Sequence, residues 1–203
     1  MKERSINLRP HEVRGLLDGT VTQLWRPAKE FVAHCDTWPD EAHPARESGW
    51  IAWWGPQSGE SLAESAKREY RHGILCPWGE AGQRLWGRET FFVYASGEVI
   101  YRADYGPESY EGGAKGWSSS AQMSRHYSRI LLEIERVCPV RVQDITDEDA
   151  RAAGYPGRQV TNGFAGPVGW ARKVWDADNP RYPWESGPWA WQIVIRRVND
   201  ANM

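Results

Sequence analysis

The stretch LLDGTVTQLWRP, residues 16–27, decides how the N-terminal part of the chain folds, because it joins the end of a helix to the start of a strand. Upstream, Pro10 suits the first turn of a helix, and apolar residues repeat at the i, i+3, i+4 spacing in Val13, Leu16 and Leu17. Gly19 is placed to cap that helix. Residues 20–26 are rich in types that favour extended backbone. The stretch therefore predicts a helix, a glycine stop and a strand carrying polar side chains.

Three later segments predict further strands. Residues 91–94 and 99–103 are extended runs separated by a short turn, which is typical of a hairpin. Residues 130–137 alternate, with Ile130, Leu132 and Ile134 on one face and acidic residues on the other. In the closing segment, residues 189–198, we expect Trp189 and Trp191 to be core residues of a last strand that completes a small barrel.

A short helix is predicted just after residue 146. Thr146 is a natural N-cap, acidic residues fill the first turn at 147–149, and Gly154 ends the helix. The acidic residues are better explained as partners of the helix dipole than as catalysts. A weaker helical pattern covers residues 168–174. The predicted fold class is therefore α+β: a small mixed β-barrel with flanking helices.

Residues 27–75 interrupt this pattern. Their periodicity is poor, and proline, glycine, serine and charged residues are frequent. We expect a long irregular insertion within a single domain spanning residues 1–203, with a short helix at 61–70. Three tryptophans in this insertion, Trp50, Trp53 and Trp54, leave open a protein-interaction surface as a third hypothesis.

Composition limits the classes of partner. The chain has 203 residues, 40% of them hydrophobic, and 13 tryptophans, which indicates a globular protein. The formal net charge is -2, so a nucleic-acid site must be a local basic patch. No long apolar run or apolar N-terminal segment is present, and we expect a soluble, cytoplasmic protein without a membrane partner.

The three cysteines, Cys35, Cys76 and Cys138, are odd in number and widely spaced. That spacing fits neither a disulfide framework nor a zinc site. His34 lies beside Cys35, but the usual spacing of metal ligands is missing. We expect reduced thiols, no metal and no cofactor.

Several phrases in order resemble the ASCH domain, a PUA-like β-barrel family, and in particular its longer phage and prophage members. The matching stretches are LLDGTVTQLWRP, CPWGEAGQRLWGRETF, VIYRAD, SRILLEIERVCPVRVQDITDEDARAAG and PWAWQIVIRRV. The resemblance implies a barrel with helices packed at its ends and recognition of RNA or modified nucleotides. One branch of the family hydrolyses acetylated cytidine, and a ribonuclease activity is known in another.

The reactive groups of the hydrolase branch are missing. Its turn reads Gly-Arg-Lys-Thr-x-Thr-x-Arg, with a glutamate on the later helix. Here the lysine position is Val21, the second threonine is Leu24 and the glutamate position is Ala153. Thr22 and Arg26 are kept. Because valine, leucine and alanine cannot transfer protons, the resemblance implies a site that keeps its shape and loses its known catalytic groups.

The polar and aromatic residues that remain are suited to binding. Arginine forks bind phosphate or base edges, and aromatic faces stack on unpaired bases. The expected nucleotide or RNA contacts are Thr22, Gln23, Arg26, Arg84, Trp86, Arg88, Tyr101 and Arg102, with Trp25 as a further stacking candidate. The favoured hypothesis is a non-catalytic binding module for single-stranded RNA or a modified nucleotide. The alternative is a nucleoside or RNA hydrolase with relocated catalytic groups, such as Lys29, His126, Glu89 or Asp104.

Overall fold

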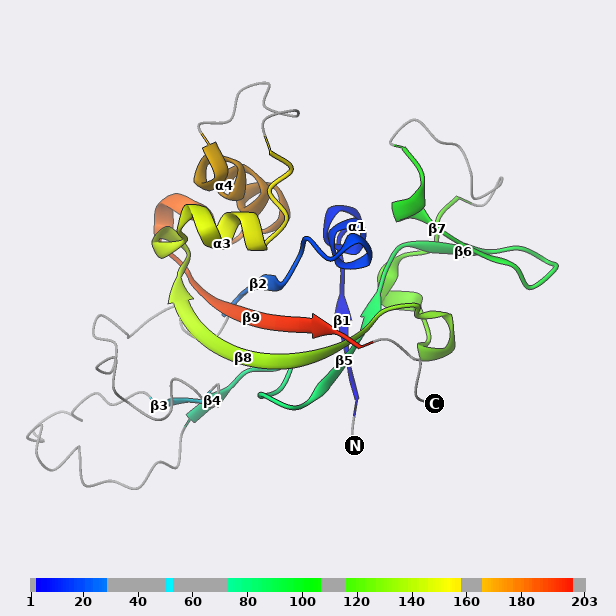
Figure 1. The fold of residues 1–203 in the computed structure, drawn as a ribbon, viewed down its shortest axis with the longest axis horizontal. Coiled ribbons are helices and arrows are strands. Elements are labelled where there is room, and N and C mark those ends of the chain that lie inside the picture. Colours follow the sequence, from blue (N-terminus) through cyan, green and yellow to red (C-terminus); the bar gives the residue numbers. More distant parts are fainter. Residues whose placement is uncertain (1–2, 29–49, 53–72, 107–115, 158–165, 199–203) are drawn as a thin grey trace, which may run out of the picture.

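A computed structural model describes residues 3–28, 50–52, 73–106, 116–157 and 166–198 (Figure 1). Its strands are β1 (Arg4–Asn7), β2 (Gln23–Pro27), β3 (Trp50–Ala52), β4 (Gly73–Leu75), β5 (Arg84–Arg88), β6 (Phe91–Val93), β7 (Val99–Tyr101), β8 (Leu131–Arg141) and β9 (Trp189–Arg197). Its α-helices are α1 (Pro10–Asp18), α3 (Asp147–Ala152) and α4 (Gly166–Asp178). The α+β fold class is confirmed.

One five-stranded sheet organises the fold. Its order is β1-β5-β8-β9-β2, with β1 and β5 parallel and the other pairs antiparallel. The long strands β8 and β9 curve together beneath the helices (Figure 1). Strand β9, expected to complete a barrel, lies inside the sheet between β8 and β2. Strands β1 and β2 are its edges, and the described strand pairs do not close the sheet, so the barrel stays a prediction.

Helix α1 forms as its sequence predicts. Pro10 occupies the first turn, and the backbone N–H of Arg9 donates to Glu12 Oε2 at 2.9 Å. Val13 and Leu16 are buried, and Gly19 ends the helix with φ 81°. This is the left-handed backbone that glycine adopts without a steric penalty.

Helix α3 also begins and ends where expected. The Thr146 hydroxyl oxygen accepts from the backbone N–H of Asp149, and Gly154 follows the helix with φ 99°. The N–H of Thr22 donates to the carbonyl of Ala152 at 2.9 Å, and Gly154 lies against Val21. The turn after α1 therefore packs directly on the C-terminal end of α3.

Strand β8 is longer than the predicted 130–137 because it continues through Pro139 to Arg141. Proline lacks the N–H that a ladder needs and is tolerated where one side of the strand is unpaired. Strand β5 pairs only with residues 131–133 of β8, so Pro139 has a paired neighbour in β9 alone among the described strands. The register also shifts between Ile134 and Arg136.

Two cores lie on the two sides of the sheet. The inner core includes Ile6, Leu8, Val13, Leu16, Val21, Leu24, Leu85, Leu132, Ile134, Trp189, Trp191, Ile193 and Ile195. The helix core, formed with α3 and α4, contains Trp25, Val142, Ile145, Ala150, Trp170, Ala171, Trp175, Trp184 and Ala190. The prediction that Trp189 and Trp191 are core residues is confirmed.

The two smaller sheets are two-stranded. Strands β6 and β7 form the predicted hairpin, and β3 pairs with β4 inside the predicted insertion. The remainder of residues 29–72, with the predicted helix at 61–70 and with Trp53 and Trp54, lies outside the described residues. In the described part of the chain, no helix has both the length and the apolar character needed to cross a bilayer.

Gly15 tests the contact between α1 and the following turn. A Cβ at Gly15 would overlap Val21 Cγ2, and both residues are buried. We expect Gly15→Ala to destabilise the protein by about 1–3 kcal/mol in urea unfolding, because β-branched Val21 has little freedom to move. The double variant with Val21→Ala should lose less free energy of unfolding than the two single variants lose when their losses are added. An increase in stability, as for Gly→Ala in an open helix, would contradict this packing.

Candidate functional site

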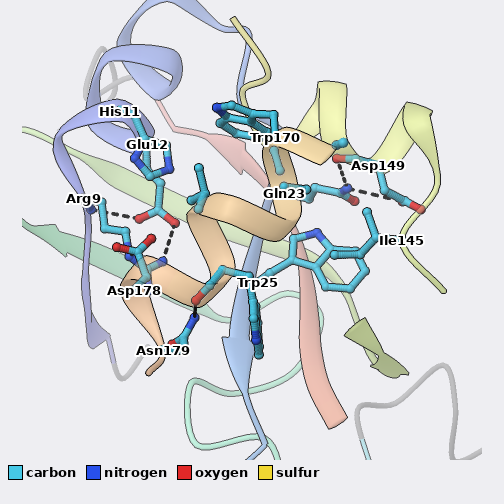
Figure 2. Close-up of a pocket in the computed structure, with 15 residues that line it drawn as sticks. Arg9, His11, Glu12, Gln23, Trp25, Ile145, Asp149, Trp170, Asp178 and Asn179 are labelled. Atoms are coloured by element: carbon cyan, nitrogen blue, oxygen red, sulfur yellow. Dashed lines mark hydrogen bonds and ion pairs between the residues drawn. The ribbon is translucent and has the colours of Figure 1, made fainter. Parts of the chain in front are cut away.

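A pocket lies where β2 faces α1, α3 and α4 (Figure 2). Water-sized groups can occupy about 50 Å³ of it, within a total empty volume of about 460 Å³ that includes the open mouth. Three tryptophans line it, Trp25 from β2 and Trp170 and Trp175 from α4. Gln23 and Asp149 are at one end, and Arg9, His11 and Asp178 at the other. An apolar pocket with a few converging polar groups is the usual form of a small-ligand site.

The polar end of the pocket is a closed hydrogen-bond network. Gln23 Nε2 donates to the Asp149 carbonyl at 2.6 Å and to Asp149 Oδ1 at 3.3 Å. Gln192 Nε2, from β9, donates to Gln23 Oε1 at 3.0 Å and to Asp149 Oδ1 at 2.8 Å. Asp149 Oδ2 accepts from the Thr146 hydroxyl at 2.7 Å. These bonds fix the side chains of both glutamines.

The tryptophans differ in how their indole N–H groups are used. Trp175 Nε1 donates to the carbonyl of Tyr182 at 2.6 Å. Trp25 is only 8% exposed, and its Nε1 is buried without a hydrogen-bond partner in the described structure. Figure 2 shows the nitrogen edge of the Trp25 ring on the side of Gln23. Leaving such a donor unpaired costs about 1–3 kcal/mol.

The charged end is built around Glu12 and Arg26, which are 4% and 7% exposed. Arg26 binds Glu12 through two nitrogens, at 2.7 and 2.9 Å. Burial alone would raise the pKa of Glu12, but Arg26 and Arg9 outweigh it and hold the pKa at about 2. Glu12 therefore stays ionised and serves as a structural anion rather than a proton acceptor.

Two further titratable groups line the pocket beside this pair. Arg9 Nε lies 2.7 Å from Asp178 Oδ2. Burial raises the pKa of Asp178, opposed by Arg9. Burial lowers the pKa of His11, so its imidazole is neutral near pH 7 and packs edge-on to Trp170 at 6.0 Å between ring centroids.

The structure separates the residues expected to bind nucleotide into three groups. In the first, Gln23 lines the pocket, whereas Thr22 is exposed on the preceding turn. Arg26 does not line this pocket. Its side chain is held by Glu12 and by the backbone carbonyls of Trp25 and Asn7, at 2.9 Å each.

The second group is a strip on strand β5. Arg84, Trp86 and Arg88 alternate with buried residues and so share one partly exposed face. The guanidinium of Arg88 lies 5.3 Å from the centre of the Trp86 ring. The Nε atoms of Arg84 and Arg88 are buried and lack hydrogen-bond partners among the described residues.

The third group lies at the β6–β7 hairpin. Tyr101 donates its hydroxyl to the carbonyl of Tyr127 and carries the Arg129 guanidinium 4.0 Å above its ring. Arg102 donates to the carbonyls of Tyr105 and Gly106. Both side chains are already engaged within the protein.

The three positions at which the resemblance would place reactive groups differ in where their side chains lie. Ala153 lines the pocket, whereas Val21 and Leu24 are buried in the inner core. Of the candidates for relocated catalysis, Glu89 and Asp104 are both bound by Arg129 at 2.7–3.0 Å. His126 is exposed and bonded to Ser124, and Lys29 lies outside the described residues.

Sequence reasoning missed several pocket residues, chiefly Asp149, His11, Trp170, Trp175 and Asp178. Asp149 was assigned to helix capping, which is correct, but it also binds Gln23 and Gln192. The tryptophans of α4 lie in and next to residues 168–174, where the helical pattern of apolar residues is weak. Their i+3 and i+4 spacing with Ala171, Val174 and Asp178 is the signal that could have grouped them on one wide face of a helix.

The described residues hold no group of three or more histidine, cysteine or acidic side chains arranged for a metal ion. Cys76 and Cys138 are buried and form no disulfide among the described residues, while Cys35 and His34 are outside the described residues. Comparison with known proteins found no matching family model, curated protein or solved structure. The functional argument therefore depends on the site itself.

The Glu12–Arg26 pair generates a pH prediction. A carboxyl whose pKa falls from its usual 4.5 to about 2 on folding adds stability that is complete above pH 5 and lost as the pH falls toward 2. We expect Glu12→Gln to cost about 3 kcal/mol at pH 7, because it leaves Arg26 buried without a counter-ion. The cost should shrink between pH 5 and pH 2 in urea unfolding series.

A matched control for that series is Glu185→Gln. Glu185 forms an ion pair with Arg172 in which both side chains are largely exposed. Such pairs contribute under about 1 kcal/mol. Equal effects of the two substitutions at pH 7 would contradict the role given to Glu12.

Proposed function

We propose that this protein is a non-catalytic binding module for RNA or a modified nucleotide, of the ASCH and PUA-like type. The observation that carries the proposal is the tryptophan-lined pocket with a fixed polar end, beside the turn that carries the resemblance. Flat aromatic walls suit a nucleobase, because base stacking on an aromatic ring contributes about 1–3 kcal/mol. Hydrogen-bonding groups at one end supply orientation.

The form of the sheet supports the PUA-like part of the proposal. Arg26 on edge strand β2 donates to the carbonyl of Asn7 on edge strand β1, so the two edges approach each other. We propose that the curled sheet is a barrel of the PUA-like type, closed at this point by side chains rather than by strand pairing.

On the strip of Arg84, Trp86 and Arg88, Arg84 and Trp86 supply the proposed contact with phosphate, because both terminal nitrogens of Arg88 already donate within the protein, to the Ala121 carbonyl and to the Ser5 hydroxyl. Arginine donors and an aromatic face together bind single-stranded nucleic acid without reading its sequence. The net charge of -2 makes such a local patch necessary, because the whole chain has no positive field to attract a polyanion.

Binding is proposed in preference to hydrolysis because two of the pocket's carboxylates, Glu12 and Asp149, are committed to structure. Glu12 is ionised and paired, and Asp149 accepts hydrogen bonds at both carboxylate oxygens. A general base needs a free lone pair within reach of the substrate proton.

Titration of intrinsic tryptophan fluorescence tests the proposal. The ligands are single-stranded RNA, single-stranded DNA, cytidine and acetylated cytidine, each at two salt concentrations. We expect saturable quenching by RNA and by at least one nucleoside, with only the RNA affinity falling as salt rises. No response to any ligand would overturn the proposed function.

A pair of arginine variants distinguishes RNA binding at the strip from nucleoside binding in the pocket. Arg84→Gln should lower the slope of log affinity for RNA against log salt by about 0.7, the value for one phosphate contact on a single strand, and leave nucleoside binding unchanged. Arg172→Gln, an exposed arginine on α4, is the control and should change neither. Equal slopes for the two variants would remove the strip from the binding surface.

A further inference from the structure

The pocket contains one buried hydrogen-bond donor that the fold does not use. Most buried polar atoms in proteins have a partner, so an exception among the residues that line a pocket points to what a ligand there supplies. Trp25 lines the pocket and is more than nine-tenths buried, and its Nε1 has no partner in the described residues. The donor requires an acceptor atom.

Neighbouring groups do not meet this need in the described structure. Gln23 Oε1 accepts from Gln192, and both Asp149 carboxylate oxygens accept from other donors. The network therefore holds its own atoms in place, and Trp25 Nε1 is left as a buried donor without a partner among the described residues. An indole nitrogen only donates, so the missing partner is an acceptor and not a cation or a second donor.

The rest of the pocket defines the other properties of this partner. Trp25, Trp170 and Trp175 supply apolar walls, which favour a flat, largely uncharged ring system. The only nearby arginine lining the pocket, Arg9, is neutralised by Asp178 at 2.7 Å. The pocket is thus suited to a neutral ring rather than to a phosphate.

We propose that the pocket binds a heterocyclic base through a ring carbonyl oxygen that accepts a hydrogen bond from Trp25 Nε1. This inference rests on the proposed function and specifies the atom that the site recognises. A carbonyl oxygen is the strong acceptor of pyrimidine bases, and sulfur in its place is a weak one. Replacing that oxygen by sulfur should therefore mimic loss of the indole N–H.

The test is an NMR titration of the indole N–H signals with matched oxygen and sulfur nucleosides. The pairs are uridine with 2-thiouridine, uridine with 4-thiouridine, and cytidine with 2-thiocytidine. The Trp25 signal is assigned by its loss in Trp25→Phe. We expect the oxygen nucleosides to shift this signal downfield and to bind about three- to ten-fold more tightly than one sulfur counterpart, the effect of one hydrogen bond.

Two variants complete the experiment. Trp25→Phe keeps an aromatic wall and should abolish the preference for oxygen over sulfur. Trp175→Phe removes an N–H that already serves Tyr182, so it should lower the stability of the fold and keep the preference. The comparison of oxygen and sulfur affinities uses wild-type protein, so that part of the result does not depend on either variant folding.

The possible failures are distinct. If nucleosides bind but the Trp25 signal does not move, or if oxygen and sulfur forms bind equally, the carbonyl inference is overturned and the proposed function survives. If wild-type protein binds neither nucleosides nor RNA, both are overturned.

Discussion

The buried ion pair between Glu12 and Arg26 is the contact on which the arrangement of the site depends. Arg26 lies on one edge strand of the sheet, and its four hydrogen bonds reach α1, its own strand and the opposite edge strand β1. Two ions buried this deeply are tolerable only when the remaining donors are also satisfied. Because they are, the pair holds β1, α1 and β2 in one fixed relation, and α1 contributes one wall of the pocket.

Strand alternation separates this structural function from the pocket. On β2, Leu24 and Arg26 face the inner core and α1, whereas Gln23 and Trp25 face α3 and α4. Leu24 and Arg26 therefore stabilise the fold, whereas Gln23 and Trp25, which alternate with them in the sequence, line the pocket. The same alternation explains why Arg26, an arginine in a stretch of expected ligand contacts, points away from the pocket that its neighbours form.

Local pattern was enough to predict α1 with its Gly19 cap, the β6–β7 hairpin and the capped start of α3, because each is encoded within a few residues. It could not predict that Glu12 pairs with Arg26 or that Asp149 binds Gln192, since these partners are joined only by tertiary packing. For that reason the sequence indicated only the part of the pocket lining that comes from β2, Gln23 and Trp25. The opposite wall comes from α4, where the helical pattern in the sequence is weak.

The apolar side chains of Val21 and Ala153 have a consistent physical consequence. Val21 is buried against Gly15 and Gly154, so the turn packs on α1 and α3 with an apolar contact where a lysine would carry a charge. Ala153 leaves the pocket wall without a carboxylate. What remains near it is a hydrogen-bonded network of Gln23, Asp149 and Gln192, together with the buried, unpaired donor of Trp25. Because both oxygens of the Asp149 carboxylate accept hydrogen bonds within this network, that carboxylate holds the pocket's shape rather than a reacting proton, which is the basis of the proposed binding role.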